Sequence, residues 1–201
     1  MPFCRYADDG VLLCQSLAHA TNLREQLSAR LADCGLELRP DKTRVVYCKD
    51  ANRRQAHDVI QFDFLGFNFR PRMANNRRGK VFLSFSPAPS RVALEDMRQT
   101  VRGWWLQLRS DLSRKELGQF YSPVIRGWMS YHTCFRPSEF QKVSEYLARF
   151  LIRWAMRKFK RLKGHWLRAL RWLRAQSQSQ PGLFPHRGAV GRFRVGLMGA
   201  R

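Results

Sequence analysis

Residues 3–14 read FCRYADDGVLLC, so two adjacent acids, Asp8 and Asp9, stand between two short apolar runs. The runs at 3–6 and 11–14 predict strands, and Asp9-Gly10 predicts the tight turn between them, because Gly accepts the positive φ of such turns. The two carboxylates repel each other unless a cation lies beside them. Mg²⁺ prefers such oxygen ligands, but Asp also suits turns for conformational reasons alone. A metal-binding hairpin and a plain Asp turn are both open at this point.

The positive charge of the chain is concentrated after residue 70. The 201 residues carry 37 Lys and Arg against 15 Asp and Glu, a formal net charge of +22. Residues 1–70 contribute +1 of this charge, and residues 71–201 contribute +21. Because 44% of the residues are hydrophobic, the chain can form a core and is not a disordered basic tail. Such an excess of charge indicates a polyanionic partner, with nucleic acid first and an anionic membrane surface as the alternative.

The first 85 residues have the pattern of β-hairpins plus one helix. Apolar residues at intervals of three and four predict a helix of about 16 residues that Gly35 ends, at Leu17, Ala20, Leu23, Leu27 and Leu31. Residues 36–38 and 45–48 predict short strands. The alternation from Ile60 predicts a strand that passes a bulge at Gly66 and continues to Phe69, with 80–85 as its partner strand.

After residues 86–90 (SPAPS) the apolar period becomes helical. The first predicted helix runs from Ala93 to Leu108. Capping boxes predict the starts of two more, at Ser113 with Glu116 and at Ser138 with Gln141, and Ser122-Pro123 predicts another start between them. The helix after Ser138 should bury Phe140, Val143, Leu147, Phe150, Leu151 and Trp154. A last helical stretch is predicted at 165–176.

Blocks along the whole sequence, in the family's order, resemble those of group II intron reverse transcriptase/maturases. Tyr6-Ala7-Asp8-Asp9 resembles the metal-binding hairpin of reverse transcriptases, and residues 35–43 resemble the segment that follows it. Residues 62–67 (FDFLGF) resemble a family signature whose hairpin grips the primer end. Residues 122–131 (SPVIRGWMSY) and 153–162 (RWAMRKFKRL) resemble NPIIRGWANY and RWARRKYKRL of the thumb and maturase region.

The resemblance implies an α+β fold in three parts. Residues 1–86 would be a partial reverse-transcriptase palm, made of β-hairpins plus one helix and including a primer-grip-like hairpin. Residues 87–187 would be an all-helical thumb and maturase region that binds RNA, and residues 188–201 a flexible basic tail. The family's fingers and most of its palm, with a further catalytic Asp, precede the YADD hairpin. Since only two residues precede Phe3 here, we expect a C-terminal portion of a larger enzyme.

The same resemblance implies roles for individual residues. Asp8 and Asp9 would bind Mg²⁺ in a two-metal site that is incomplete in this chain, and Lys42 would help to protonate the leaving pyrophosphate. The primer-grip-like residues would be Phe62, Phe64, Leu65, Gly66 and Phe67. The expected RNA contacts are Arg126, Arg149, Arg153, Arg157, Lys158, Lys160, Arg161 and Lys163. Of these, Arg153, Arg157, Lys160 and Arg161 are predicted to share one helical face.

Each of these roles has an alternative that does not involve a ligand. Lys42 suits an exposed turn, and alternating Phe residues commonly pack in a core. The six Trp residues have helical spacing, which favours core packing over base stacking. The basic run 153–163 could be a solvated face, but the lack of acids near it favours phosphate binding.

Two functions stay open. One is an RNA-directed DNA polymerase that uses an RNA template and a DNA primer in the full-length protein. The other is an RNA-binding splicing cofactor for group II intron RNA, whose palm remnant is inert. We expect the second for this chain, which alone should be inactive as a polymerase. Five cysteines without a CxxC pair, and no signal peptide or membrane span, favour a cytosolic protein. Together with the resemblance, this implies a cytoplasmic ribonucleoprotein with intron RNA and no membrane partner. The oligomeric state is not indicated.

Overall fold

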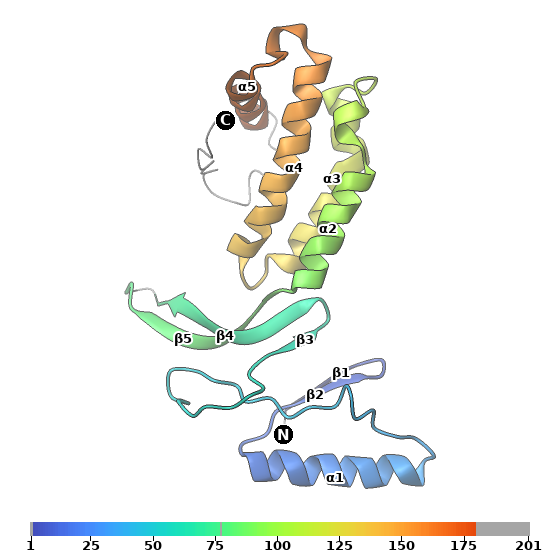
Figure 1. Ribbon diagram of the computed structural model, residues 1–201, viewed down its shortest axis with the longest axis vertical. Helices are drawn as coiled ribbons and strands as arrows, with labels where there is room; N and C mark the ends of the chain where they lie inside the picture. The colour runs from blue at the N-terminus through green and yellow to red at the C-terminus, as the bar shows by residue number, and fades with distance from the viewer. Residues whose placement is uncertain (1, 77, 180–201) are drawn as a thin grey trace. The chain divides into compact units, whose positions relative to one another are not determined.

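The computed structural model describes residues 2–76 and 78–179, which fall into two compact units, the first up to residue 61 and the second from residue 62 onward (Figure 1). The first unit contains β1 (Phe3–Tyr6), β2 (Asp9–Leu12) and α1 (Leu17–Asp33). In the second unit, β3 (Phe62–Phe64), β4 (Phe67–Asn75) and β5 (Val81–Pro89) precede the helices. These are α2 (Arg91–Gly103), η1 (Leu106–Leu108), α3 (Arg114–His132), α4 (Pro137–Lys158), η2 (Lys160–Leu162) and α5 (Trp166–Ser179). The predicted α+β fold is confirmed, while the predicted tail 188–201 lies outside the described residues.

The β1–β2 hairpin forms where predicted, but its turn is not at Asp9-Gly10. Tyr6 pairs with Asp9, so the turn residues are Ala7, which has φ +51°, and Asp8. The cross-strand partners explain the shift. The observed register places Phe3 opposite Leu12 and Cys4 opposite Val11, whereas a turn at 9–10 would place the same two residues opposite Ser16 and Gln15. Apolar cross-strand pairs stabilise a hairpin, so pairing overrides the turn preference of Asp-Gly.

The predicted helix near residue 17 is confirmed, and the two strands predicted after it are wrong. The Ser16 side chain accepts a hydrogen bond from the His19 backbone N–H at the start of α1, and Gly35 follows the helix with φ +70°. Residues 36–38 and 45–48 are not strands. A strand needs a ladder of backbone bonds to a partner, but the backbone bond that links 45–48 to a distant residue runs from Tyr47 N–H to the Val59 carbonyl. The β-branched and aromatic residues of that segment therefore lie in irregular backbone.

The second sheet is antiparallel with the order β3-β4-β5. Phe64 pairs with Phe67, so Leu65 and Gly66 form a two-residue turn in which both have positive φ, +49° and +73°. The predicted bulge at Gly66 is therefore wrong: the alternating run folds back on itself instead of continuing. The predicted partner strand is confirmed and is longer than expected, because β5 pairs with β4 from Val81 to Pro89.

The helical half keeps its predicted apolar faces but not all of its predicted ends. The capping box of Ser113 and Glu116 is present at the start of α3. Pro123 does not begin a new helix and lies inside α3, because a continuous helix lets the residues on both sides of it reach the core, which outweighs one lost backbone bond. Pro137 at the first turn starts α4, so the predicted cap at Ser138 is one residue inside the helix. The first predicted helix ends at Gly103, since Trp105 has φ +49°.

The core of the second unit surrounds α4, which packs against α2, η1, η2 and α5. The predicted buried side of α4 is confirmed: Phe140, Val143, Leu147, Phe150, Leu151 and Trp154 are all buried. The Trp154 indole N–H donates to the Arg109 carbonyl at 2.9 Å, so the largest core side chain also holds the connection between η1 and α3. Within the described residues, no helix is both long and apolar enough to cross a membrane.

Candidate nucleic-acid interface

Three arginines follow one another along the surface of α4. Arg149, Arg153 and Arg157 are all exposed, and each is four residues from the next. Residues four apart share a helix face and rise by about 6 Å. Since the opposite side of α4 is buried in the core, the three guanidinium groups line the solvent side as a row of positive charge. We call these three residues the α4 arginine row.

The basic residues after Arg157 do not continue this row. Phe159 is extended, with φ −107° and ψ 110°, and it ends α4 at Lys158. Lys160 and Arg161 then lie in η2, so the prediction that they share a helical face with Arg153 and Arg157 is wrong. The cause is the burial of Leu162 and the ring contact of Phe159 with Trp172, which turn the chain back onto α5. Lys160, Arg161 and Lys163 are nevertheless exposed.

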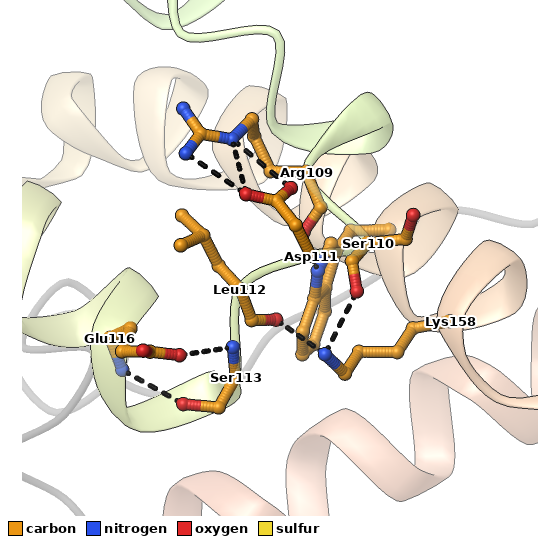
Figure 2. A network of polar contacts seen from close by, with 8 residues as sticks. Arg109, Ser110, Asp111, Leu112, Ser113, Glu116 and Lys158 are labelled. Carbon is orange, nitrogen blue, oxygen red and sulfur yellow. Dashed lines mark hydrogen bonds and ion pairs between the residues drawn. The ribbon is translucent and has the colours of Figure 1, made fainter.

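Lys158, predicted to bind RNA, points toward the connection before α3 instead. Its ammonium group donates to the Ser110 carbonyl at 2.9 Å and to the Leu112 carbonyl at 2.7 Å (Figure 2). Its Nζ also lies 5.9 Å from the centre of the Trp154 ring, over its face. Two carbonyl acceptors and an aromatic face satisfy an ammonium group within the protein. Lys158 is thus bonded within the protein, whereas the cations around it in the sequence are exposed.

The two acids in and just after this connection, Asp111 and Glu116, are held by bonds to nearby residues. Arg109 forms an ion pair with Asp111 at 3.1 Å, and its hydrogen bonds lower the pKa of that carboxyl. Glu116 accepts from the Ser113 N–H at 2.6 Å, and the Ser113 bonds lower the pKa of Glu116 (Figure 2). After Glu145 the sequence has no further acid. The cations from Arg149 onward therefore have no carboxylate of their own segment to neutralise them.

Further candidate cations lie on α3 and α5. Arg126, a predicted RNA contact, is exposed on α3. Arg168 and Arg171 were not predicted, and both are exposed on α5. They border an open depression of about 390 Å³ that is lined by Gly164, His165, Trp166, Leu167, Arg168 and Arg171. The helical period could have predicted the exposure of these two arginines, because it places them away from Ala169 and Leu173, which are buried.

The primer-grip-like residues lie at the turn between β3 and β4. Phe62 stacks on Phe69 with their ring centres 4.8 Å apart, and Phe85 lies 6.2 Å from Phe62. Phe64 and Leu65 are half-buried, Gly66 is exposed and Phe67 is buried. The described contacts of these Phe residues are packing contacts within the protein. Packing was the alternative to a primer contact in the sequence analysis.

The carboxylates Asp8 and Asp9 are exposed at the tip of the β1–β2 hairpin. Carboxylate oxygens in this position suit Mg²⁺, which binds through one or two carboxylates and keeps several waters. Among the described residues, no group of three His, Cys, Asp or Glu side chains is placed to hold a metal ion. Lys42 is exposed in a turn in which its N–H donates to the Arg39 carbonyl at 3.1 Å. The donor chemistry of the tip fits Mg²⁺, but it supplies two ligands rather than the three of a complete two-metal site.

Two family models match the chain in separate regions. The model described as reverse transcriptase (RNA-dependent DNA polymerase) matches residues 1–69. The model described as group II intron, maturase-specific domain matches residues 94–172. The first region carries the YADD and FDFLGF motifs, and the second carries the α4 arginine row. No curated protein and no solved structure matches the chain.

Proposed function

Because this chain belongs to the group II intron reverse transcriptase/maturase family, we propose that its helical region binds group II intron RNA and assists splicing. The observation that carries the proposal is the α4 arginine row, Arg149, Arg153 and Arg157, exposed along one face of a helix whose other face is core. A row of fixed cations neutralises successive phosphates and releases their counterions, which makes binding strong and dependent on salt. In this proposal residues 1–86 are palm-like, and residues 87–187 are the RNA-binding part of a cytoplasmic ribonucleoprotein.

The distribution of charge supports phosphate contacts over base stacking. Residues 146–179 contain ten Lys and Arg and no acid. Two of their aromatic rings are engaged inside the protein: Trp154 is fully buried, and Trp172 packs against Phe159 with ring centres 4.8 Å apart. Such rings stabilise the fold and cannot stack on bases without leaving the core. The proposed interface therefore consists mainly of cations.

The test is RNA binding by a variant of the full chain in which Arg149, Arg153 and Arg157 are changed to Gln. The matched control changes three exposed arginines of the first unit, Arg24, Arg44 and Arg54, to Gln, so both variants lose three charges. Each lost phosphate contact flattens the slope of log K against log salt by about 0.7–0.9. For a base-paired RNA hairpin, we expect the row variant to bind about tenfold more weakly and to flatten the slope by about 2. Equal behaviour of the two variants would refute the proposal.

A second candidate function rests on Asp8 and Asp9 at the hairpin tip. In this proposal they bind Mg²⁺ for RNA-directed DNA synthesis on an RNA template with a DNA primer, together with a further carboxylate beyond the two described. When bound, Mg²⁺ would offset the repulsion between the two carboxylates and supply the positive charge that nucleotidyl transfer requires. Lys42 would serve as a proton donor. Phe62, Phe64, Leu65, Gly66 and Phe67 would shape the primer-grip-like hairpin. The incomplete ligand set favours RNA binding as the function of residues 1–201.

A further inference from the structure

A second group of exposed cations lies far from α4 in sequence, on the β4–β5 ribbon. We use this name for residues 70–76 and 78–86, which include the parts of β4 and β5 that pair with each other beyond the short strand β3 (Figure 1). Arg70, Arg78 and Lys80 are exposed on it. Between Asp63 and Glu95 the sequence contains no acid. The described residues give these three cations no ion pair, so their charge is directed to solvent.

Near the tip of the ribbon, the backbone of Arg78 and Lys80 is bonded to Asn76. The Asn76 side-chain oxygen accepts from the backbone N–H groups of Arg78 and Lys80, each at 2.9 Å, and Gly79 has φ +77°. The Asn76 N–H in turn donates to the Lys80 carbonyl at 3.0 Å. These bonds fix where the two cationic side chains leave the backbone. Arg78 and Lys80 are therefore presented from hydrogen-bonded backbone.

Arg72 has a different role from its neighbours on the ribbon. It is 9% exposed and donates to the Ser86 carbonyl and to the Asn68 side-chain oxygen. The Asn68 amide donates to Asp63 at 2.7 Å, so Arg72 is linked through it to an acid of the FDFLGF motif. Burial lowers the pKa of the Arg72 guanidinium. Arg72 thus holds β4 to β5, and the cations available to a partner are the three exposed ones.

The base of the ribbon is attached to the C-terminal end of α3. The Tyr131 hydroxyl donates to the Leu65 carbonyl at 2.7 Å, and the Ser90 N–H donates to the Gly66 carbonyl at 2.9 Å. Both carbonyls of the β3–β4 turn are therefore bonded to the helical part. The adjacent Phe67 ring is enclosed by Tyr131, His132 and Phe135, whose ring centres lie 5.1–5.4 Å away.

A further bond joins the ribbon to the start of α4, since the Arg136 guanidinium donates to the Met73 carbonyl. Arg136 directly precedes α4, the helix that carries the arginine row. The ribbon is thus held directly at Met73 and, through the start of β4, at the turn 65–66 that precedes it. Two attachments fix its direction relative to the helices more strongly than one.

We propose that the β4–β5 ribbon is a second phosphate-binding surface, which contacts the same RNA as the α4 arginine row. This inference rests on the proposed RNA-binding function. Arg70, Arg78 and Lys80 supply the charge, and the Tyr131–Leu65 bond positions them. When two surfaces are held in one body, binding of the first places the second at a high effective concentration near the RNA. Tyr131 is in this sense a positioning residue that touches no RNA.

The first experiment changes Arg70, Arg78 and Lys80 to Gln in the full chain. Its control is the first-unit variant Arg24→Gln, Arg44→Gln, Arg54→Gln, which loses the same charge. For a long base-paired RNA hairpin, we expect the ribbon variant to bind about tenfold more weakly and to flatten the salt slope by about 2, as three lost phosphate contacts require. The first-unit control should change affinity by less than about twofold, because its charges lie outside the proposed contacts.

The second experiment tests the positioning role with Tyr131→Phe, which removes the hydroxyl and keeps the ring beside Phe67. We expect weaker binding of the same RNA in an otherwise wild-type chain. In the ribbon variant, Tyr131→Phe should have no further effect, because the ribbon no longer contributes to binding. A role in stability alone would weaken binding equally in both backgrounds, and thermal unfolding of each variant separates the two cases.

The outcomes distinguish this inference from the proposed function. If the wild type binds with a steep salt slope, the row variant loses affinity and the ribbon variant matches the first-unit control, the second surface is refuted and the proposed function stands. If the wild type shows no salt-dependent binding, both are refuted. If Tyr131→Phe weakens binding equally with and without the ribbon cations, the positioning role is refuted.

Discussion

Lys158 is bonded to carbonyls within the protein, whereas the neighbouring cations that we propose to bind RNA are exposed. Lys158→Met keeps the length of the side chain and removes the ammonium group that donates to the Ser110 and Leu112 carbonyls at 2.9 and 2.7 Å. A hydrogen bond to a charged group contributes about 1.5–3 kcal/mol. Because Lys158 is only half-buried, water can replace part of this interaction. We expect a loss of about 2 kcal/mol in the free energy of unfolding, which lowers Tm by about 4–8 °C in a chain of this size.

The measurement is thermal unfolding together with RNA binding, and the matched control is Arg157→Met. Arg157 directly precedes Lys158 in α4 but is exposed in the arginine row. The two variants should have opposite effects: Lys158→Met lowers Tm and leaves RNA affinity nearly unchanged, whereas Arg157→Met weakens binding and leaves Tm nearly unchanged. Equal Tm values for wild type and Lys158→Met, with a loss of affinity as large as that of Arg157→Met, would refute the structural role of Lys158.

Two further predictions concern the hairpin tip and a buried histidine. Residues 1–201 should make no DNA on a primed RNA template with Mg²⁺ or Mn²⁺, and Asp8→Asn with Asp9→Asn should leave RNA affinity unchanged; DNA synthesis by this chain would contradict the incomplete metal site. Burial lowers the pKa of His132, so the unfolded state binds its proton more readily than the folded state. The free energy of unfolding should therefore be highest above pH about 6.5 and decrease as the pH falls from there toward the folded-state pKa. His132→Phe should flatten this dependence in thermal unfolding between about pH 7.5 and about pH 5; an unchanged pH dependence would assign it to other groups.

The features that could be predicted from the sequence depend on residues close together in the chain. The capping box at Ser113 needs only Glu116 three residues later, and the buried side of α4 follows from one helical period. Exposure of the α4 arginine row follows from the same period, since a face opposite buried residues must face solvent. Local signals were enough for each of these, and tertiary packing did not oppose them.

The predictions that failed depend on partners that the sequence does not name. Residues 45–48 have strand composition but no strand beside them. Asp9-Gly10 has the stronger turn signal, but the pairing of Phe3 with Leu12 decides the register. Pro123 signals a helix start, but the packing on both sides of it keeps α3 continuous. In the last two cases, contacts with other residues outweigh a local preference of about 1–3 kcal/mol.

The basic run 153–163 shows how the same limit affects a functional site. In the sequence its cations are equivalent, and all were predicted to bind RNA. In the structure Phe159 ends the helix and divides the run, while Lys158 turns inward to two carbonyls. Conversely, Arg70, Arg78 and Lys80 belong to a second basic cluster of the sequence, at residues 70–80, and were not predicted to bind RNA. The bond from Tyr131 to the Leu65 carbonyl, across 66 residues of sequence, attaches their ribbon to the helices. Charge density along the chain therefore identifies the kind of partner, whereas the residues that contact it depend on where folding leaves each cation.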